Sequence, residues 1–93
     1  MAKIKWGKRA VKDLKSIHDY ISLDSAFYAH RYVNKLISRV DQLETQPDSG
    51  RIVPEKEDPS IRELIEGNYR IFYKIQKNNI FILRIHHAAR NIN

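Results

Sequence analysis

The sequence contains no cysteine and has only three glycines and three prolines among its 93 residues. The lack of cysteine excludes disulfides, thiolate metal ligands and a cysteine nucleophile, and four histidines without zinc-ligand spacing predict no metal site. No apolar run approaches the roughly 18 residues that a membrane span requires, and the segment Met1 to Lys5 lacks the apolar core of a signal peptide. We therefore expect a cytoplasmic protein with no metal, no other cofactor and no membrane partner.

The residues that are present are those of one globular domain. Hydrophobic residues make up 42% of the chain and charged residues 30%, which lies outside the ranges of disordered, collagen-like and disulfide-scaffold sequences. A chain of this length buries about 60 to 68% of its extended surface in a single core. Repeats, low-complexity tracts and internal linkers are absent from the sequence, so residues 1–93 are expected to fold as one unit.

Acidic residues are missing from both ends of the chain. Asp13 is the first and Glu66 the last, and Lys and Arg outnumber Asp and Glu by 17 to 11. The first 12 residues and the last 27 each carry five basic side chains. If the two ends meet in the fold, they form a positive surface suited to nucleic acid or to an acidic protein. The alternative is a soluble basic protein without such a partner.

Apolar periodicity predicts a strand followed by two helices. Lys3 to Trp6 alternates as a strand does, and about Lys8 to Ser22 has an apolar stripe at helical spacing. Asp24 or Ser25 can cap a second helix. Its stripe consists of Ala29, Val33, Leu36, Val40 and Leu43. The short connection between the helices predicts an antiparallel pair. Pro47 stops the second helix and begins a polar loop.

From Ile61 onward the period changes to two, which predicts strands. The three runs are Ile61 to Glu66, Tyr69 to Ile75 and Ile80 to His87. Gly67-Asn68 joins the first two as a two-residue hairpin turn. The predicted fold class is α+β: an N-terminal strand, a two-helix antiparallel hairpin, and a three-stranded antiparallel meander forming one small sheet, with the helices on its apolar face.

The hairpin turns predict the register. Gly67-Asn68 places Leu64 opposite Ile71 and Glu63 opposite Phe72. For the second hairpin, an odd-length loop gathers the apolar residues of the last two strands on one face. These residues are Ile71, Tyr73, Phe81, Leu83 and Ile85.

The same register predicts a charged open face, with Arg70 opposite Arg84, Asn68 opposite His86, and Glu63 diagonal to Arg70. Facing arginines destabilise a sheet unless an anion compensates them, so an anionic partner is one interpretation. Another is that both guanidiniums extend into water or that Glu63 neutralises one.

Two histidines end the last strand. Because His86 and His87 are adjacent, they point to opposite faces, and His86 shares the face of Arg70. A histidine pKa near 6.5 suits general acid or base catalysis. Glu63, Arg70 and His86 would then supply a base, a phosphate-charge stabiliser and an acid for metal-independent attack of a 2′-hydroxyl on RNA.

These residues resemble the RelE/ParE superfamily of type II toxins, and the resemblance covers nearly the whole chain. The segments that carry it are Arg62-Glu63-Leu64, Gly67 to Tyr73, Ile80 to His86 and Arg90, with Ala10, Asp13-Leu14, Ile17, Tyr20-Ile21, Gly50-Arg51 and Val53-Pro54-Glu55 before them. The resemblance implies a toxin that a cognate antitoxin neutralises in a hetero-oligomeric complex, commonly one that represses its own operon. The antitoxin segment is expected to be acidic or amphipathic.

Members of this superfamily differ in their target. RelE-like members are ribosome-dependent mRNA endonucleases with lysines on the strand before the hairpin, an arginine in the hairpin and a tyrosine in the C-terminal tail. This sequence keeps Arg70 but has Ile61 and Glu63 at the lysine positions, and it ends without a tyrosine. Other nuclease members use a glutamate, an arginine and a terminal histidine, which Glu63, Arg70 and His86 or His87 match.

ParE-like members inhibit DNA gyrase and commonly end in Leu-x-x-x-His-x-x-Arg, which Leu83, His87 and Arg90 fit. The sequence thus favours a plasmid-stabilisation toxin of the ParE type that binds gyrase and has no catalytic residues. The candidate target-binding residues are Arg70, Arg84, His86, His87 and Arg90. Alternatives are a RelE-like endonuclease acting on the ribosome and mRNA, and a non-toxic member that binds only antitoxin and DNA.

Overall fold

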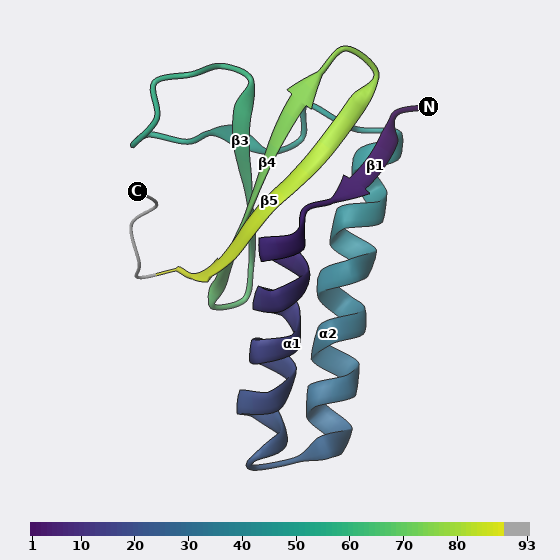
Figure 1. Ribbon diagram of the computed structural model, residues 1–93, viewed down its shortest axis with the longest axis vertical. Coiled ribbons are helices and arrows are strands. Elements are labelled where there is room, and N and C mark those ends of the chain that lie inside the picture. The colour runs from purple at the N-terminus through teal and green to yellow at the C-terminus, as the bar shows by residue number, and fades with distance from the viewer. Residues whose placement is uncertain (89–93) are drawn as a thin grey trace.

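The computed structural model describes residues 1–88. Two helices pack side by side against one face of a mixed five-stranded sheet (Figure 1). The elements are β1 (Lys3–Trp6), α1 (Lys8–Ser22), α2 (Ala26–Asp41), the 3-10 turn η1 (Gln42–Glu44), β2 (Arg51–Ile52), β3 (Ile61–Glu66), β4 (Tyr69–Gln76) and β5 (Asn79–His87). The strand order is β1-β5-β4-β3-β2, with β1 parallel to β5 and the other pairs antiparallel. The α+β prediction is confirmed; the two-residue strand β2 lies in the segment predicted as a loop.

The helical hairpin begins and is capped as its sequence predicts. Helix α1 follows β1 directly because Gly7 lies against β5, where its N–H donates to the Ile82 carbonyl at 2.9 Å. A Cβ at this position would lie 2.8 Å from the same oxygen. Helix α2 is capped by Ser25, whose Oγ accepts from the N–H of Tyr28. None of the helices in residues 1–88 is long and apolar enough to cross a bilayer.

The core lies between the helices and the sheet. Its buried members include Ala10, Ile17, Leu36, Val40, Leu43, Leu64, Ile71, Tyr73, Ile80, Ile82 and Ile85. The helices extend well past the sheet, so the turn between α1 and α2 projects away from the strands (Figure 1). A smaller cluster on the opposite sheet face consists of Val53 and Phe72, against which Ile61 and Leu83 pack. That face is therefore partly covered, rather than open as predicted.

The first hairpin has the predicted register. Glu66 pairs with Tyr69, Leu64 with Ile71 and Glu63 with Phe72, and the turn residue Gly67 has φ +58°. A side chain is rarely tolerated at that φ, which explains the glycine.

The predicted register of the second hairpin is wrong. Gln76 pairs with Asn79 across a two-residue turn in which Lys77 has φ +55°. This even-length turn puts Ile80 and Ile82 in the core in place of Phe81 and Leu83.

A register shift at Phe72/Tyr73 then inserts one extra residue in β5, because Tyr73 pairs with Ile82 and Phe72 with Arg84. The shift returns Ile85 to the core face. It also brings His86 opposite Arg70, so Arg70 and Arg84 do not face each other. The predicted pairing of Asn68 with His86 is likewise wrong, since the Asn68 carbonyl accepts from the N–H of Ala88.

Candidate functional site

A cluster of alternating charges occupies the sheet face opposite the helices. Arg70 donates from Nε to Glu63 Oε1 at 2.6 Å, and its two terminal nitrogens donate to the two carboxylate oxygens of Glu55 at 2.9 Å each. Glu63 also accepts from Arg51 Nε at 2.6 Å. We call these four residues the ionic cluster. Adjacent strands hold three of them, and Glu55 reaches Arg70 from the loop after β2.

The centre of the ionic cluster is shielded from water. The side chain of Glu63 is 0% exposed and that of Arg70 7%, whereas Arg51 is 65% exposed. Hydrogen bonds from Arg70 to Glu55 and Glu63 raise the pKa of its guanidinium above the ordinary value, against the opposing effect of burial. Arg70 therefore stays charged, and two carboxylates already neutralise that charge.

The structure brings Glu63, Arg70 and His86 together, as the nuclease alternative requires. His86 pairs directly with Arg70 across the sheet and is 8% exposed. The His86 ring packs edge-on against Phe72, with ring centroids 5.5 Å apart, and the Arg70 guanidinium lies 4.7 Å from the centroid of the same ring. All of these side chains lie in a packed layer with little access for a substrate.

His87 points to the other face, as adjacent strand residues must. It is exposed, and its ring lies 5.7 Å from that of Tyr69, which in turn lies 5.7 Å from that of Tyr32. A hollow of about 420 Å³ borders this aromatic row, with Tyr20 and Asn68 also in its lining. Of the predicted target-binding residues within 1–88, His87 is therefore the most accessible.

Arg84 belongs to a separate ion pair. Its Nε and one terminal nitrogen donate to the carboxylate of Asp13 at 2.8 and 3.1 Å, and Asp13 also accepts from the Ile85 N–H at 2.9 Å. Burial raises the pKa of Asp13, but these hydrogen bonds outweigh burial and hold it below its ordinary value. This ion pair connects helix α1 to the part of β5 that follows Ile82, where β1 no longer pairs with β5. Arg90, the remaining candidate, lies outside the described residues.

The tip of the helical hairpin carries exposed apolar side chains to which the sequence assigned no role in binding. Tyr20, Leu23, Phe27 and Tyr28 are 71%, 82%, 65% and 64% exposed; we call them the tip patch. Their positions fall outside the apolar stripes that the two helices turn toward the core. This pattern in the sequence could have indicated that they are exposed. Contiguous exposed apolar residues are typical of protein-binding surfaces.

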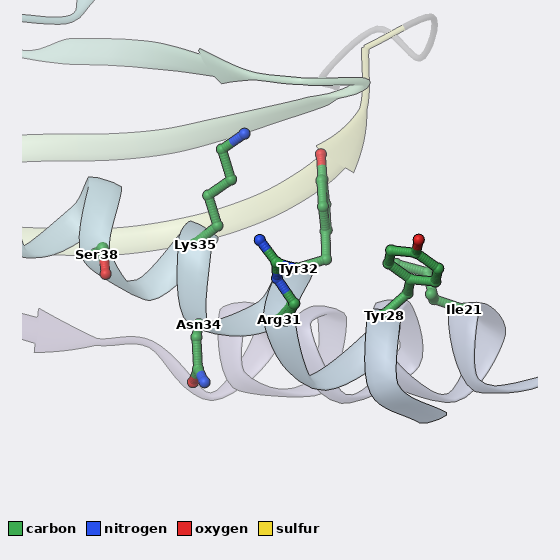
Figure 2. A pocket seen from close by; sticks show the side chains of 7 residues that line it. All are labelled: Ile21, Tyr28, Arg31, Tyr32, Asn34, Lys35 and Ser38. Atoms are coloured by element: carbon green, nitrogen blue, oxygen red, sulfur yellow. The ribbon is translucent and has the colours of Figure 1, made fainter. Parts of the chain in front are cut away.

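A groove continues from the tip patch along α2 (Figure 2). It has a volume of about 520 Å³ and combines Tyr28 and Tyr32 with the cationic side chains of Arg31 and Lys35. Lys35 points toward the sheet, where its Nζ lies 3.3 Å from Glu66. Aromatic surface beside positive charge suits an amphipathic, acidic protein segment. In residues 1–88, no three acidic or histidine side chains are grouped to hold a metal ion.

Comparisons with known proteins agree on one family. A family model described as the ParE toxin of the type II toxin-antitoxin system parDE matches residues 4–92. The toxin RelE2 of Caulobacter vibrioides is 36% identical over 91 residues, which cover 97% of this chain and 99% of that protein.

Solved structures give the same result for the fold. The chromosomal ParDE toxin-antitoxin system of P. aeruginosa matches with a TM-score of 0.76 and 28% identity, covering 94% of this chain and 96% of that one. The toxin-antitoxin complex RelBE2 of Mycobacterium tuberculosis matches with a TM-score of 0.69 and 18% identity, covering 92% and 96%, which shows the shared fold alone.

Proposed function

The chain belongs to the ParE toxin family of type II toxin-antitoxin systems, and we propose that it acts in the cytoplasm by binding and inhibiting DNA gyrase. In this proposal the toxin has no catalytic residues and works as a protein ligand. In the same proposal a cognate antitoxin neutralises it in a hetero-oligomeric complex. The similar solved structures are named a ParDE toxin-antitoxin system and a RelBE2 toxin-antitoxin complex, which supports an antitoxin partner.

The state of Arg70 supports gyrase inhibition over RNA cleavage. A nuclease needs this arginine to contact a phosphate, but the side chain of Arg70 is 7% exposed and is bound by Glu55 and Glu63. At the positions where the resemblance places nuclease lysines, this chain has Ile61 and Glu63, and Glu63 is itself buried. The cations that would stabilise a cleavage transition state are thus missing or already paired.

The tip patch supplies the surface that such a ligand requires. Its exposed aromatic and aliphatic side chains are of the kind that dominate binding energy at protein interfaces. We propose that Leu23 and Phe27 contact gyrase and that His87 lies at the margin of this contact. Arg70 and His86 are too buried to contact a target without rearrangement.

A supercoiling assay tests the proposal. Purified toxin added to gyrase, ATP and relaxed plasmid should inhibit supercoiling or accumulate cleaved DNA, and adding the antitoxin should restore activity. If supercoiling proceeds unchanged and no cleaved DNA accumulates at a large excess of toxin, the proposal is wrong.

Two observations favour the alternative of a ribosome-dependent mRNA endonuclease. Glu63, Arg70 and His86 lie together on one sheet face, and the relative named RelE2 is 36% identical. Mapping 5′ ends of translated mRNA in cells that express the toxin tests this alternative. New cleavage sites that require translation would support it, and intact mRNA at the time growth stops would exclude it.

A further inference from the structure

Six exposed basic side chains of β1 and the first half of α1 lie apart from the ionic cluster. They are Lys3, Lys5, Lys8, Arg9, Lys12 and Lys15, and we call them the basic face. All six are exposed. Within residues 1–88, none of them makes an ion pair with an acidic side chain. Their charge is therefore available to a partner.

Three of these lysines form a row on one side of α1. Lys8, Lys12 and Lys15 are separated by four and three residues, which places them on one helix face over about 10 Å of its axis. The acid nearest to them in sequence, Asp13, is engaged by Arg84. Asp19, which is exposed and lies on the same helix face one turn beyond Lys15, marks the end of the positive row.

The row continues into a groove where α1 meets the sheet. This groove has a volume of about 430 Å³, and its lining includes Lys8, Arg9, Lys74 and Phe81. Lys5 Nζ lies 5.8 Å from the centroid of the Phe81 ring. The groove therefore has cations on both sides.

We propose that the basic face binds the phosphate backbone of duplex DNA without reading its sequence. Duplex DNA carries one negative charge per about 1.7 Å of its axis, so a lysine row of about 10 Å meets about three phosphates of one strand. Long, flexible lysines suit phosphate contacts, which position a protein without specifying bases. This activity goes beyond gyrase inhibition and does not depend on it.

The composition of the basic face argues against other partners. Lysine is depleted in the cores of protein interfaces, which are rich in aromatic residues. Single-stranded nucleic acids are held by exposed aromatic rings on which bases stack, whereas Phe81 is partly buried and beside Lys5. Val11, a large apolar side chain that is 50% exposed near the row, has no ring on which a base could stack.

Fluorescence anisotropy of a labelled duplex of about 20 bp, titrated with the full-length chain at several salt concentrations, tests the proposal. Lys8→Glu/Lys12→Glu reverses two charges of the row. Arg31→Glu/Lys35→Glu is the matched control, because it changes the net charge equally, at the same helical spacing and at exposed positions on α2. Circular dichroism of each variant verifies its fold, and Lys12→Glu/Lys15→Glu replaces the first variant if that one unfolds.

We expect the logarithm of the wild-type binding constant to fall with the logarithm of salt concentration at a slope of about −4. The Lys8/Lys12 variant should bind about tenfold more weakly at 0.1 M salt, with the slope shallower by about two. The control should lose no more than about threefold. Equal losses in both variants would mean that net charge alone attracts DNA, and would overturn the proposal. Absent binding, or tighter binding of a single strand than of the duplex, would overturn it as well.

Discussion

Replacing Arg70 by methionine tests whether the ionic cluster is structural. The substitution keeps an apolar stem of similar length beside Phe72 but removes the guanidinium that binds Glu55 and Glu63. Glu63, with a side chain 0% exposed, then keeps Arg51 as its partner in the cluster. Glu55, which is 27% exposed, can rehydrate.

The expected loss follows from this remaining pairing. Removing one partner of a buried ion pair costs about 3–5 kcal/mol, because it leaves an uncompensated buried charge. Since Arg51 still binds Glu63, we expect a loss of about 3 kcal/mol, at the lower end of that range. With a urea m-value of about 1.5 kcal/mol per M, the unfolding midpoint falls by about 2 M.

Urea unfolding followed by far-UV circular dichroism measures this loss. Arg39→Met is the matched control, because Arg39 is 31% exposed and pairs with Glu66 at 3.3 Å; it should lose less than about 1 kcal/mol. Glu63→Leu/Arg70→Met should be more stable than Arg70→Met, since no charge remains buried. If Arg70→Met is no less stable than Arg39→Met, Arg70 is not held as described, and it would be available to a substrate.

Three further predictions concern stability and partner binding. The pKa of Asp13 is lower in the folded chain than in the unfolded chain. Its stabilising effect is therefore fully present above the unfolded-state pKa and is lost as the pH falls through the lower folded-state pKa, and Asp13→Asn should flatten that acidic part of the profile of unfolding free energy against pH. Tyr73→Phe should cost about 2 kcal/mol in urea unfolding, because the buried N–H of Gly50 donates to the Tyr73 hydroxyl at 2.9 Å; an unchanged midpoint would contradict this. Leu23→Ser should change the free energy of unfolding by no more than about 0.5 kcal/mol but weaken gyrase inhibition about tenfold. The exposed control Val11→Ser should change neither quantity. If both variants inhibit gyrase equally, the tip patch is not part of the interface.

Local patterns predicted most of the fold. The apolar stripe of α1 predicted both ends of that helix. The helix begins at Lys8, after the glycine that contacts β5, and ends at Ser22, before the turn. Gly67-Asn68 predicted the first hairpin register because a two-residue turn fixes which residues face each other. In each case the residues that decide the structure are adjacent in sequence.

The second hairpin failed because its decisive feature is not local. The prediction assumed that one register holds along the whole of β5, and it chose the turn length accordingly. That assumption is wrong, because the register shifts at Phe72/Tyr73. The shift allows a two-residue turn and still places Ile85 in the core. Nothing in the apolar alternation distinguishes an odd turn from an even turn followed by a bulge.

The candidate site was predicted in part. Neutralisation of Arg70 by Glu63 was one of the interpretations open from sequence, and the structure has this contact. Glu55 was not assigned a role, because it lies in a loop whose path alternation does not predict. Yet Glu55 accepts two of the three described hydrogen bonds from the guanidinium, so it is a main partner of Arg70.

The ionic cluster also sets an energetic condition on the nuclease alternative. For Arg70 to reach a phosphate, it must first leave Glu55 and Glu63, and opening a buried pair costs about 3 kcal/mol. A substrate that binds only the open form has its apparent affinity reduced by the open fraction, here about a hundredfold. The proposed inhibition of gyrase through the tip patch carries no such penalty, because Leu23 and Phe27 are already exposed in the folded chain. An RNA substrate must therefore replace both carboxylates at Arg70, whereas a protein target needs only to cover apolar surface.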